Sequence, residues 1–305
     1  METLQNDNLT VQIDSLLGGK IAQIVDRRTR RAWLSHHPRL DWHVLDAAEL
    51  ALPEPYGRLG DLGGWDECCP TVGSSHYPLL PYAGLPLVDH GECWLQQPEE
   101  QRDGMRIEHT WRGKALPFEL RRRIELDCER PHLALSYTLR SLSDERLALL
   151  WSAHPLVAIE AGMRLELAEG TRMTINSEGS PLGSPGTSFE WPLCGTFDLS
   201  LITPQAAWYA KMFSEILDPG EVSLLAPSGE RLRLSWSSGQ RLLRLGLWLN
   251  YNGCSGDGGD PLQVVGLEPC VGATDALEDA VAEGTALVLE PGGQRDWQVW
   301  VDVTD

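Results

Sequence analysis

The stretch 264-VVGLEPCVGATDALEDAV-281 places a glutamate, Glu268, directly before a proline inside an apolar run that is otherwise typical of a buried β-strand. The residue before a proline is extended and proline cannot donate to a sheet ladder, so we expect Glu268 where regular strand pairing stops. Alternation puts Val264, Gly266 and Glu268 on one face, and Gly266 leaves space beside the carboxylate. A partly apolar setting would raise the pKa of Glu268 toward that of a general base. The alternative is a salt-bridged glutamate at a strand edge.

The same two-residue alternation recurs along the chain and predicts an all-β protein. Buried faces are expected for Ile107, His109 and Trp111, for Leu133, Leu135, Tyr137 and Leu139, and for Trp297, Val299, Val301 and Val303. Clusters of Gly and Pro separate these runs, as tight turns require. One short helix is predicted at 274–284, with Asp275 as N-cap, Glu278 as its capping-box partner and Gly284 as its stop. The stretch near residues 175–190 is predicted to be a long surface loop, and residues 1–305 to form one domain.

Composition restricts the classes of function. The chain has 305 residues, and no apolar run approaches the roughly 18 residues that a membrane helix needs, so no membrane partner is expected. A formal net charge of −19 disfavours binding to nucleic acid. The N-terminus lacks the pattern of a secretory signal, and seven irregularly spaced cysteines indicate reduced thiols. We therefore expect a cytoplasmic protein.

A second strand has the same local design as the Glu268 strand. In 147-LALLWSAHPLVAIE-160, His154 precedes a proline and shares a face with Leu150 and Ser152. Imidazole titrates near neutral pH and can donate a proton to a developing oxygen anion, although a histidine bonded to backbone in the core is at least as common. A further histidine, His90, stands beside a glycine that permits close backbone approach.

Other functional signatures are absent or weak. The sequence contains no phosphate-binding loop, dinucleotide fingerprint or serine nucleophile elbow. His36, His37 and His43 lie close together, but without cysteine pairs or helical spacing they are a weak metal signal. The chain carries 12 Trp against 6 Tyr and 4 Phe, and an indole face suits a sugar as well as a core.

Several segments together resemble the aldose 1-epimerase, or galactose mutarotase-like, family. They follow the family's order from about residue 60 to the C-terminus, as GGWDECCPTV (63–72), DHGECW (89–94), WSAHPLVAIEAGMRLEL (151–167), LWLNYNG (247–253) and GLEPCVGATDALEDAVAEGTALVLEPGGQRDWQV (266–299). The resemblance implies a large antiparallel β-supersandwich with few short helices. It also implies catalysis without a metal or organic cofactor.

The resemblance also assigns roles to residues. Glu268 takes the proton of the anomeric hydroxyl, His154 protonates the ring oxygen, and His90 resembles the histidine that holds the ring-oxygen side of the sugar. We further predict substrate contacts from five side chains. These are stacking by Trp65, Trp94 or Trp248 and hydroxyl binding by Glu67 or Lys211.

Two departures from the family bear on the substrate. Members that act on hexose 6-phosphates carry an arginine soon after the His-Gly, whereas here Glu92, Cys93 and Trp94 follow. This argues against a phosphosugar. The Asn-Leu that often follows the family's His-Pro step is replaced by LVAIE, so the sugar specificity is open.

The sequence therefore predicts a mutarotase that interconverts the α and β anomers of a non-phosphorylated monosaccharide, acting as a monomer or homodimer. The main alternative is a non-catalytic carbohydrate-binding or sensing protein on the same fold. A third possibility is a lyase or glycosidase step, which needs a second carboxylate across from Glu268 that the sequence does not identify.

Overall fold

Two large antiparallel sheets carry most of the chain in the computed structural model, which describes residues 1–36, 56, 63–254 and 262–305. The ten-stranded sheet has the order β1 (Glu2–Gln5), β2 (Leu9–Asp14), β3 (Lys20–Asp26), β4 (Gly64–Cys68), β12 (Trp151–Ala158), β22 (Gln263–Val271), β21 (Arg244–Tyr251), β18 (Trp208–Ile216), β14 (Arg172–Ile175) and β15 (Ser188–Glu190). The eight-stranded sheet has the order β13 (Arg164–Glu166), β19 (Gly220–Leu225), β20 (Arg231–Ser237), β24 (Gln294–Thr304), β10 (His132–Ser141), β9 (Phe118–Leu126), β8 (Arg106–Arg112) and β7 (Glu99–Asp103). The all-β antiparallel prediction is confirmed.

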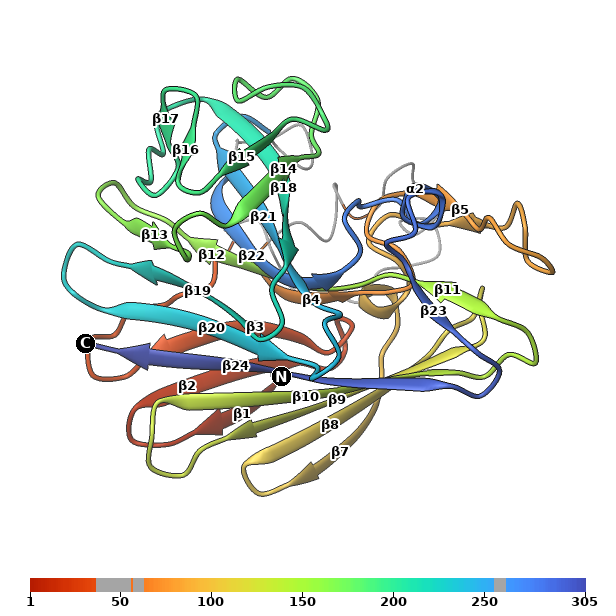
Figure 1. The fold of residues 1–305 in the computed structure, drawn as a ribbon. Helices are drawn as coiled ribbons and strands as arrows, with labels where there is room; N and C mark the ends of the chain where they lie inside the picture. The colour runs from red at the N-terminus through yellow and green to blue at the C-terminus, as the bar shows by residue number, and fades with distance from the viewer. Residues whose placement is uncertain (37–55, 57–62, 255–261) are drawn as a thin grey trace.

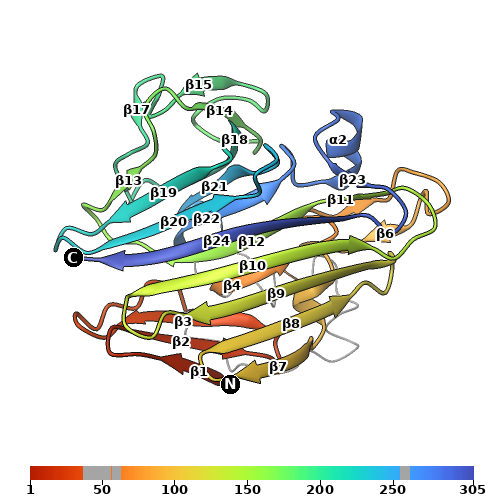
Figure 2. The same ribbon diagram turned by 60° about the horizontal axis from the view of Figure 1, so that its bottom comes forward.

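The two sheets pack face to face around the hydrophobic core (Figure 1), and Figure 2 shows the eight-stranded sheet in front. Trp151 of the ten-stranded sheet joins them, because its ring lies 4.8 Å from Tyr137 and 4.6 Å from Trp297 of the other sheet. The predicted inward faces are buried in β8, β10 and β24. Their alternation arises because successive side chains of a strand point to opposite faces.

Smaller elements flank the two large sheets. They are three two-stranded pairs, β5 (Ser75–His76) with β6 (Pro86–Leu87), β11 (Leu147–Leu149) with β23 (Leu287–Leu289) and β16 (Leu193–Cys194) with β17 (Phe197–Asp198), the 3-10 turn η2 (Cys93–Leu95) and the helix α2 (Leu277–Ala282). In Figure 1, strands β14 to β17 and the α2–β5 region rise on two sides of the ten-stranded sheet.

The structure corrects two details of the sequence prediction. Helix α2 has Ala276 as its N-cap, without a side-chain hydrogen bond, so the prediction that Asp275 caps it is wrong. Gly284, with φ +70°, does follow the end of the helix. The predicted loop is shorter than 175–190, because residues 188–190 form β15 and pair with β14.

None of the helices among the described residues is long and apolar enough to cross a membrane. Five of the seven cysteines, Cys68, Cys69, Cys93, Cys194 and Cys270, are buried thiols that pack within the fold.

Candidate active site

The register of the ten-stranded sheet brings Asp66, His154 and Glu268 into one row across three neighbouring strands. His154 of β12 pairs with Asp66 of β4. On its other side, β12 pairs with β22 at Ser152–Cys270 and at Leu156–Gly266, so His154 stands level with Glu268 between these pairs. The row lies on the outer face, because the intervening residues belong to the core between the sheets.

Two prolines interrupt the strand pairing beside this row. The ladder between β12 and β22 breaks off after Ser152–Cys270 and resumes at Leu156–Gly266. Pro155 and Pro269 lie within this gap, and neither has an N–H to donate. The sequence-based expectation that Glu268 sits in a strand where pairing stops is confirmed.

Of the two oxygens of the Glu268 carboxylate, Oε2 accepts the hydrogen bonds from the described residues. Lys211 Nζ donates to Oε2, and Ser152 Oγ lies 3.4 Å from the same oxygen. The other oxygen, Oε1, lies 3.6 Å from His154 Nε2 and has no hydrogen-bond partner among the described residues. Glu268 is 1% exposed, and this burial raises the pKa of its carboxyl group although the Lys211 ammonium opposes the shift. The structure thus places this carboxylate oxygen beside an imidazole.

Gly266 provides the space for that oxygen. A Cβ at this position would lie 2.6 Å from Glu268 Oε1 and 3.0 Å from Trp248 Cβ, which no side chain could tolerate without displacing the carboxylate. The prediction that Gly266 leaves room beside Glu268 is confirmed.

Lys211 reaches the row from β18 and bridges two carboxylates. Besides Glu268, its Nζ lies 3.6 Å from Asp275 Oδ1. Burial alone would lower the pKa of Lys211, but the carboxylates of Asp275 and Glu268 outweigh it and raise the pKa above its ordinary value. Lys211 is therefore a permanent cation. Asp275, for which the sequence predicts a role in helix capping, is a site residue.

His154 is bonded on the side away from Glu268. Its Nδ1 lies 3.1 Å from the hydroxyl of Tyr56, and the ring is almost fully buried. Burial lowers its pKa well below the ordinary value, and the charges of His90, Lys211 and Lys20 lower it further. The imidazole is consequently neutral near pH 7.

His90 stands beside His154 at the edge of the row. Its ring stacks on Tyr56 at 3.6 Å between centroids and meets the His154 ring edge-on at 4.9 Å. Its Nδ1 lies 3.0 Å from Asp89 Oδ1. The backbone at His90 has φ +60° and the next residue, Gly91, has φ +73°, so the glycine serves the unusual turn that presents this histidine.

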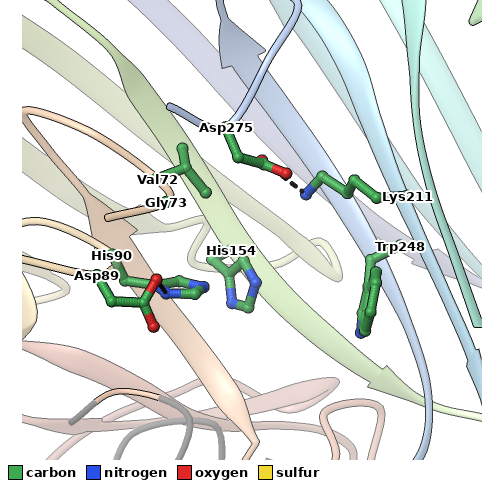
Figure 3. A pocket seen from close by; sticks show the side chains of 8 residues that line it. All are labelled: Val72, Gly73, Asp89, His90, His154, Lys211, Trp248 and Asp275. Carbon is green, nitrogen blue, oxygen red and sulfur yellow. Dashed lines mark ion pairs between the residues drawn. The ribbon is translucent and has the colours of Figure 1, made fainter. Parts of the chain in front are cut away.

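These groups line one pocket of about 190 Å³, smaller than the roughly 300–1,000 Å³ of pockets for drug-sized ligands. Figure 3 shows both histidines and Trp248 around it, with Lys211 and Asp275 joined at its rim. Its lining consists of Val72, Gly73, Asp89, His90, His154, Lys211, Trp248 and Asp275. Glu268 lies directly beneath this lining, in contact with His154 and Lys211. The space suits one small polar ligand.

The structure brings only part of the predicted site together. His90, His154, Lys211 and Trp248 line the pocket and Glu268 adjoins it, whereas the other three predicted contacts do not. Trp65 belongs to the hydrophobic core. Trp94 packs edge-on against Tyr56, 4.9 Å between centroids, and its Nε1 donates to the carbonyl of Asp89. Both indoles therefore pack within the protein around the site rather than at the surface of the pocket.

Glu67 faces the core between the sheets. Its Oε1 accepts hydrogen bonds of 2.9 Å from Arg122 and from Tyr137, and its Oε2 accepts one of 2.9 Å from Trp151. Glu67 and Arg122 are both essentially inaccessible to solvent. The sequence predicts that Glu67 binds sugar hydroxyls. In the structure, its carboxylate makes its hydrogen bonds inside the protein.

Among the described residues, 1–36, 56, 63–254 and 262–305, no group of three His, Cys, Asp or Glu side chains is placed to hold a metal ion. Of the three clustered histidines, His36 pairs with Gly63 in an isolated bridge. His37 and His43 lie outside the described residues.

No protein-family model matches this chain, and no curated protein matches its sequence. Solved structures do match. A galactose mutarotase-like protein from Lactobacillus casei has a TM-score of 0.71 at 14% identity, with 100% of both chains covered. A galactose mutarotase related enzyme from Lactobacillus acidophilus has a TM-score of 0.69 at 14% identity, covering 100% of this chain and 97% of that one. A galactose mutarotase-like protein from Clostridium acetobutylicum has a TM-score of 0.68 at 13% identity, covering 99% and 94%.

The chain therefore has the galactose mutarotase-like fold, which confirms the fold predicted from the sequence. At these identities the likeness is one of fold. One fold can carry many activities, and the chemistry of the site determines which one.

Proposed function

We propose that this protein is an aldose 1-epimerase that interconverts the α and β anomers of a non-phosphorylated monosaccharide. The observation that carries the proposal is the pair formed by Glu268 Oε1 and His154 Nε2, 3.6 Å apart at the base of a pocket of monosaccharide size. One group is a carboxylate oxygen without a hydrogen-bond partner among the described residues, and the other is a ring nitrogen. A base and an acid side by side are what ring opening of a sugar requires.

The proton balance of the reaction fits this pair. Glu268 accepts the proton of the anomeric hydroxyl while His154 gives one to the ring oxygen, and the bond between C1 and the ring oxygen breaks. The free aldehyde turns about the C1–C2 bond, and the two protons return as the ring closes on the other face. The two reacting oxygens are bonded to the same carbon, so two neighbouring protein groups can serve both. Each group contributes roughly 10²- to 10⁴-fold to the rate.

The reactive state carries one proton on the pair. Glu268 must be a carboxylate and His154 an imidazolium at the moment of attack. Burial raises the pKa of the first and lowers the pKa of the second, so the same single proton can reside on either group. A sugar whose hydroxyl and ring oxygen engage the two groups would favour the charge-separated arrangement.

The charges of the pocket favour an uncharged sugar. Its described lining includes the carboxylates of Asp89 and Asp275, and Glu268 lies beneath it. Lys211, the one Lys or Arg in that lining, is paired with Glu268 and Asp275. A phosphate or carboxylate on the ligand would have to compete with these carboxylates for the ammonium.

A second function, carbohydrate binding or sensing without turnover, is favoured by one specific observation. Glu268 is 1% exposed and lies under His154 and Lys211 rather than in the open lining. A sugar reaches Oε1 only if one of the covering side chains shifts. If no shift occurs, the pocket holds the sugar without deprotonating it.

Solution NMR separates these functions. Freshly dissolved pure anomers of a panel of neutral monosaccharides are followed with and without the protein, and binding of each sugar is measured by calorimetry. Acceleration of anomer exchange for a sugar that binds supports the mutarotase. Binding without acceleration for every sugar would assign the protein to the carbohydrate-binding class, and release of new sugars from oligosaccharides would indicate a glycosidase or lyase instead.

A further inference from the structure

A buried polar chain lies behind His154, on the side away from the pocket. Lys20 Nζ donates to Asp66 and to the carbonyl of Gly63, and Asp66 Oδ2 also accepts a hydrogen bond of 3.0 Å from the hydroxyl of Tyr56. The same hydroxyl lies 3.1 Å from His154 Nδ1. Lys20, Asp66, Tyr56 and His154 are exposed by 5%, 2%, 1% and 6%. The chain is thus enclosed by protein, where polar interactions are strong and geometry is fixed.

Counting hydrogens along this chain settles where the proton of His154 resides. A carboxylate has no hydrogen to give, so in its bond with Asp66 the Tyr56 hydroxyl must be the donor. A tyrosine hydroxyl has a single hydrogen. Toward His154 the Tyr56 oxygen can therefore only accept, and Nδ1 must carry the proton. In the neutral ring the other nitrogen, Nε2, is then unprotonated, and this is the nitrogen that faces Glu268.

We propose that Tyr56 and Asp66 are positioning residues that hold a proton permanently on His154 Nδ1, so that His154 gains and loses its catalytic proton only at Nε2, toward Glu268 and the sugar. The inference rests on the proposed mutarotase function for its kinetic consequences. The tautomer that it assigns is a property of the protein alone. Neither residue is among the described residues that line the pocket.

The same series of hydrogen bonds, from Lys20 through Asp66 and Tyr56, stabilises the protonated form of His154. When Nε2 takes up a proton, Nδ1–H strengthens its bond to Tyr56, and the Asp66 charge stands directly behind the tyrosine. This support opposes the neighbours that disfavour the imidazolium, which are Lys20 beside Asp66, Lys211 from β18 and His90 with its partner Asp89. Glu268 on β22 faces Nε2 itself. Tyr56 and Asp66 therefore stabilise the imidazolium at Nδ1, while its exchangeable proton on Nε2 points toward Glu268.

The test compares Tyr56→Phe with a matched control. Tyr77→Phe also removes one buried tyrosine hydroxyl, which accepts a hydrogen bond of 2.9 Å from the Ala148 backbone away from the pocket. Ring-nitrogen NMR at pH 7.5 reports the tautomer, with the His154 signals assigned by their disappearance in His154→Gln. Wild type is expected to show a protonated Nδ1 and an unprotonated Nε2, and Tyr56→Phe a mixture of both tautomers.

Kinetics give the second readout. Tyr56→Phe is expected to lower kcat by about tenfold to a hundredfold with little change in KM, because one hydrogen bond that orients the acid is lost. Tyr77→Phe should leave both unchanged. Asp66→Asn keeps an oxygen for Tyr56 to donate to, so it should retain the wild-type tautomer while lowering kcat and shifting the pH profile.

Specific results would overturn the proposal. A wild-type spectrum with the proton on Nε2 would do so, even if Tyr56→Phe failed to fold and even if no sugar were turned over. An unchanged tautomer in Tyr56→Phe, with kcat equal to that of the Tyr77→Phe control, would do so as well. Absence of turnover in wild type with the expected tautomer would instead overturn the mutarotase and leave the positioning role standing.

Discussion

Glu268 Oε1 lies 3.6 Å from His154 Nε2, and the register of two adjacent central strands places the two residues side by side. Both residues precede a proline, so both stand where the ladder between β12 and β22 is interrupted. Groups carried by sheet strands are held more rigidly than groups on loops. The pair is therefore part of the scaffold, and the surrounding side chains decide its protonation.

Trp248 is expected to contribute to sugar affinity, since it is the tryptophan of the described pocket lining. Trp248→Ala should raise KM about fivefold to tenfold with a small change in kcat, because stacking on an aromatic ring contributes about 1 kcal/mol and does not act on the proton transfer. Trp65→Phe, in the core, should leave KM unchanged. Steady-state anomer exchange measures both variants, and equal KM values for them would exclude Trp248 from the site.

Lys211 is expected to stabilise the fold through its pairing with Glu268. Lys211→Met leaves a carboxylate buried without its cation, which costs about 3–5 kcal/mol in the free energy of unfolding. Adding Glu268→Gln removes the unpaired charge, so the double variant should regain part of this loss. Urea denaturation of both single variants and the double variant gives the coupling. Additive losses would show that the ion pair carries no such energy.

Glu67 is expected to act on stability and not on sugar binding. Glu67→Gln leaves the buried Arg122 guanidinium without its carboxylate and should lower the free energy of unfolding by about 3–5 kcal/mol. The matched control Glu108→Gln removes a surface partner of Arg123 and should cost about 1 kcal/mol or less. The sugar affinity of folded Glu67→Gln should equal that of wild type. A large loss of affinity with normal stability would place Glu67 in the binding site after all.

The buried His109 is expected to make the free energy of unfolding depend on pH. Burial lowers its pKa from 6.5 to about 4, while its hydrogen bond to Glu100 opposes the shift and the Arg122 charge adds to it. Between these values the unfolded chain binds the proton and the folded chain does not. The contribution of His109 is therefore complete above pH 6.5 and is lost as the pH falls toward 4, by about 3 kcal/mol in total.

The variant His109→Gln isolates this effect, because glutamine does not titrate and retains a donor and an acceptor. The free energy of unfolding of wild type should fall more steeply between pH 7 and pH 5 than that of the variant. The other depressed histidine, His154, is present in both proteins and cancels in the comparison. Parallel curves would show that His109 titrates normally in the folded protein.

Much of the fold was predictable because apolar and polar residues alternate clearly in the long strands. This contrast assigned the inward faces of β8, β10 and β24. Alternation also grouped Glu268 with Gly266 and His154 with Ser152, each pair on one face of its strand. The prolines after both residues marked the gap in the ladder. These features are local in sequence, so the sequence alone reveals them.

Strand β4 shows where this reasoning fails. Its residues Trp65, Asp66 and Glu67 are all buried, and a charged residue points to each face of the sheet. Without a contrast between the faces, the sequence could not tell that Asp66 turns toward the site and Glu67 toward the core. Partners from the opposite sheet, Arg122 and Tyr137, settle the orientation, and only the fold brings them close.

Two further site residues escaped the sequence for a similar reason. Asp275 fits a helix N-cap by its spacing, yet the helix begins two residues later and Asp275 pairs with Lys211, 64 positions away in the chain. Tyr56 stands in a stretch without periodicity, and its role depends on contacts with Asp66 and His154. Packing determines where the helix begins and which distant residues come into contact. The spacing of residues in the sequence does not reveal either.

The most direct test of the central claim is the rate of anomer exchange with Glu268→Gln beside wild type and the helix-surface control Glu278→Gln. The amide preserves the shape of the side chain but cannot accept the anomeric proton. We predict that wild type and Glu278→Gln accelerate exchange of a sugar that binds, and that Glu268→Gln loses roughly 10²- to 10⁴-fold of this acceleration while still binding the sugar. Equal acceleration by Glu268→Gln and wild type would contradict the assignment of Glu268 as the catalytic base.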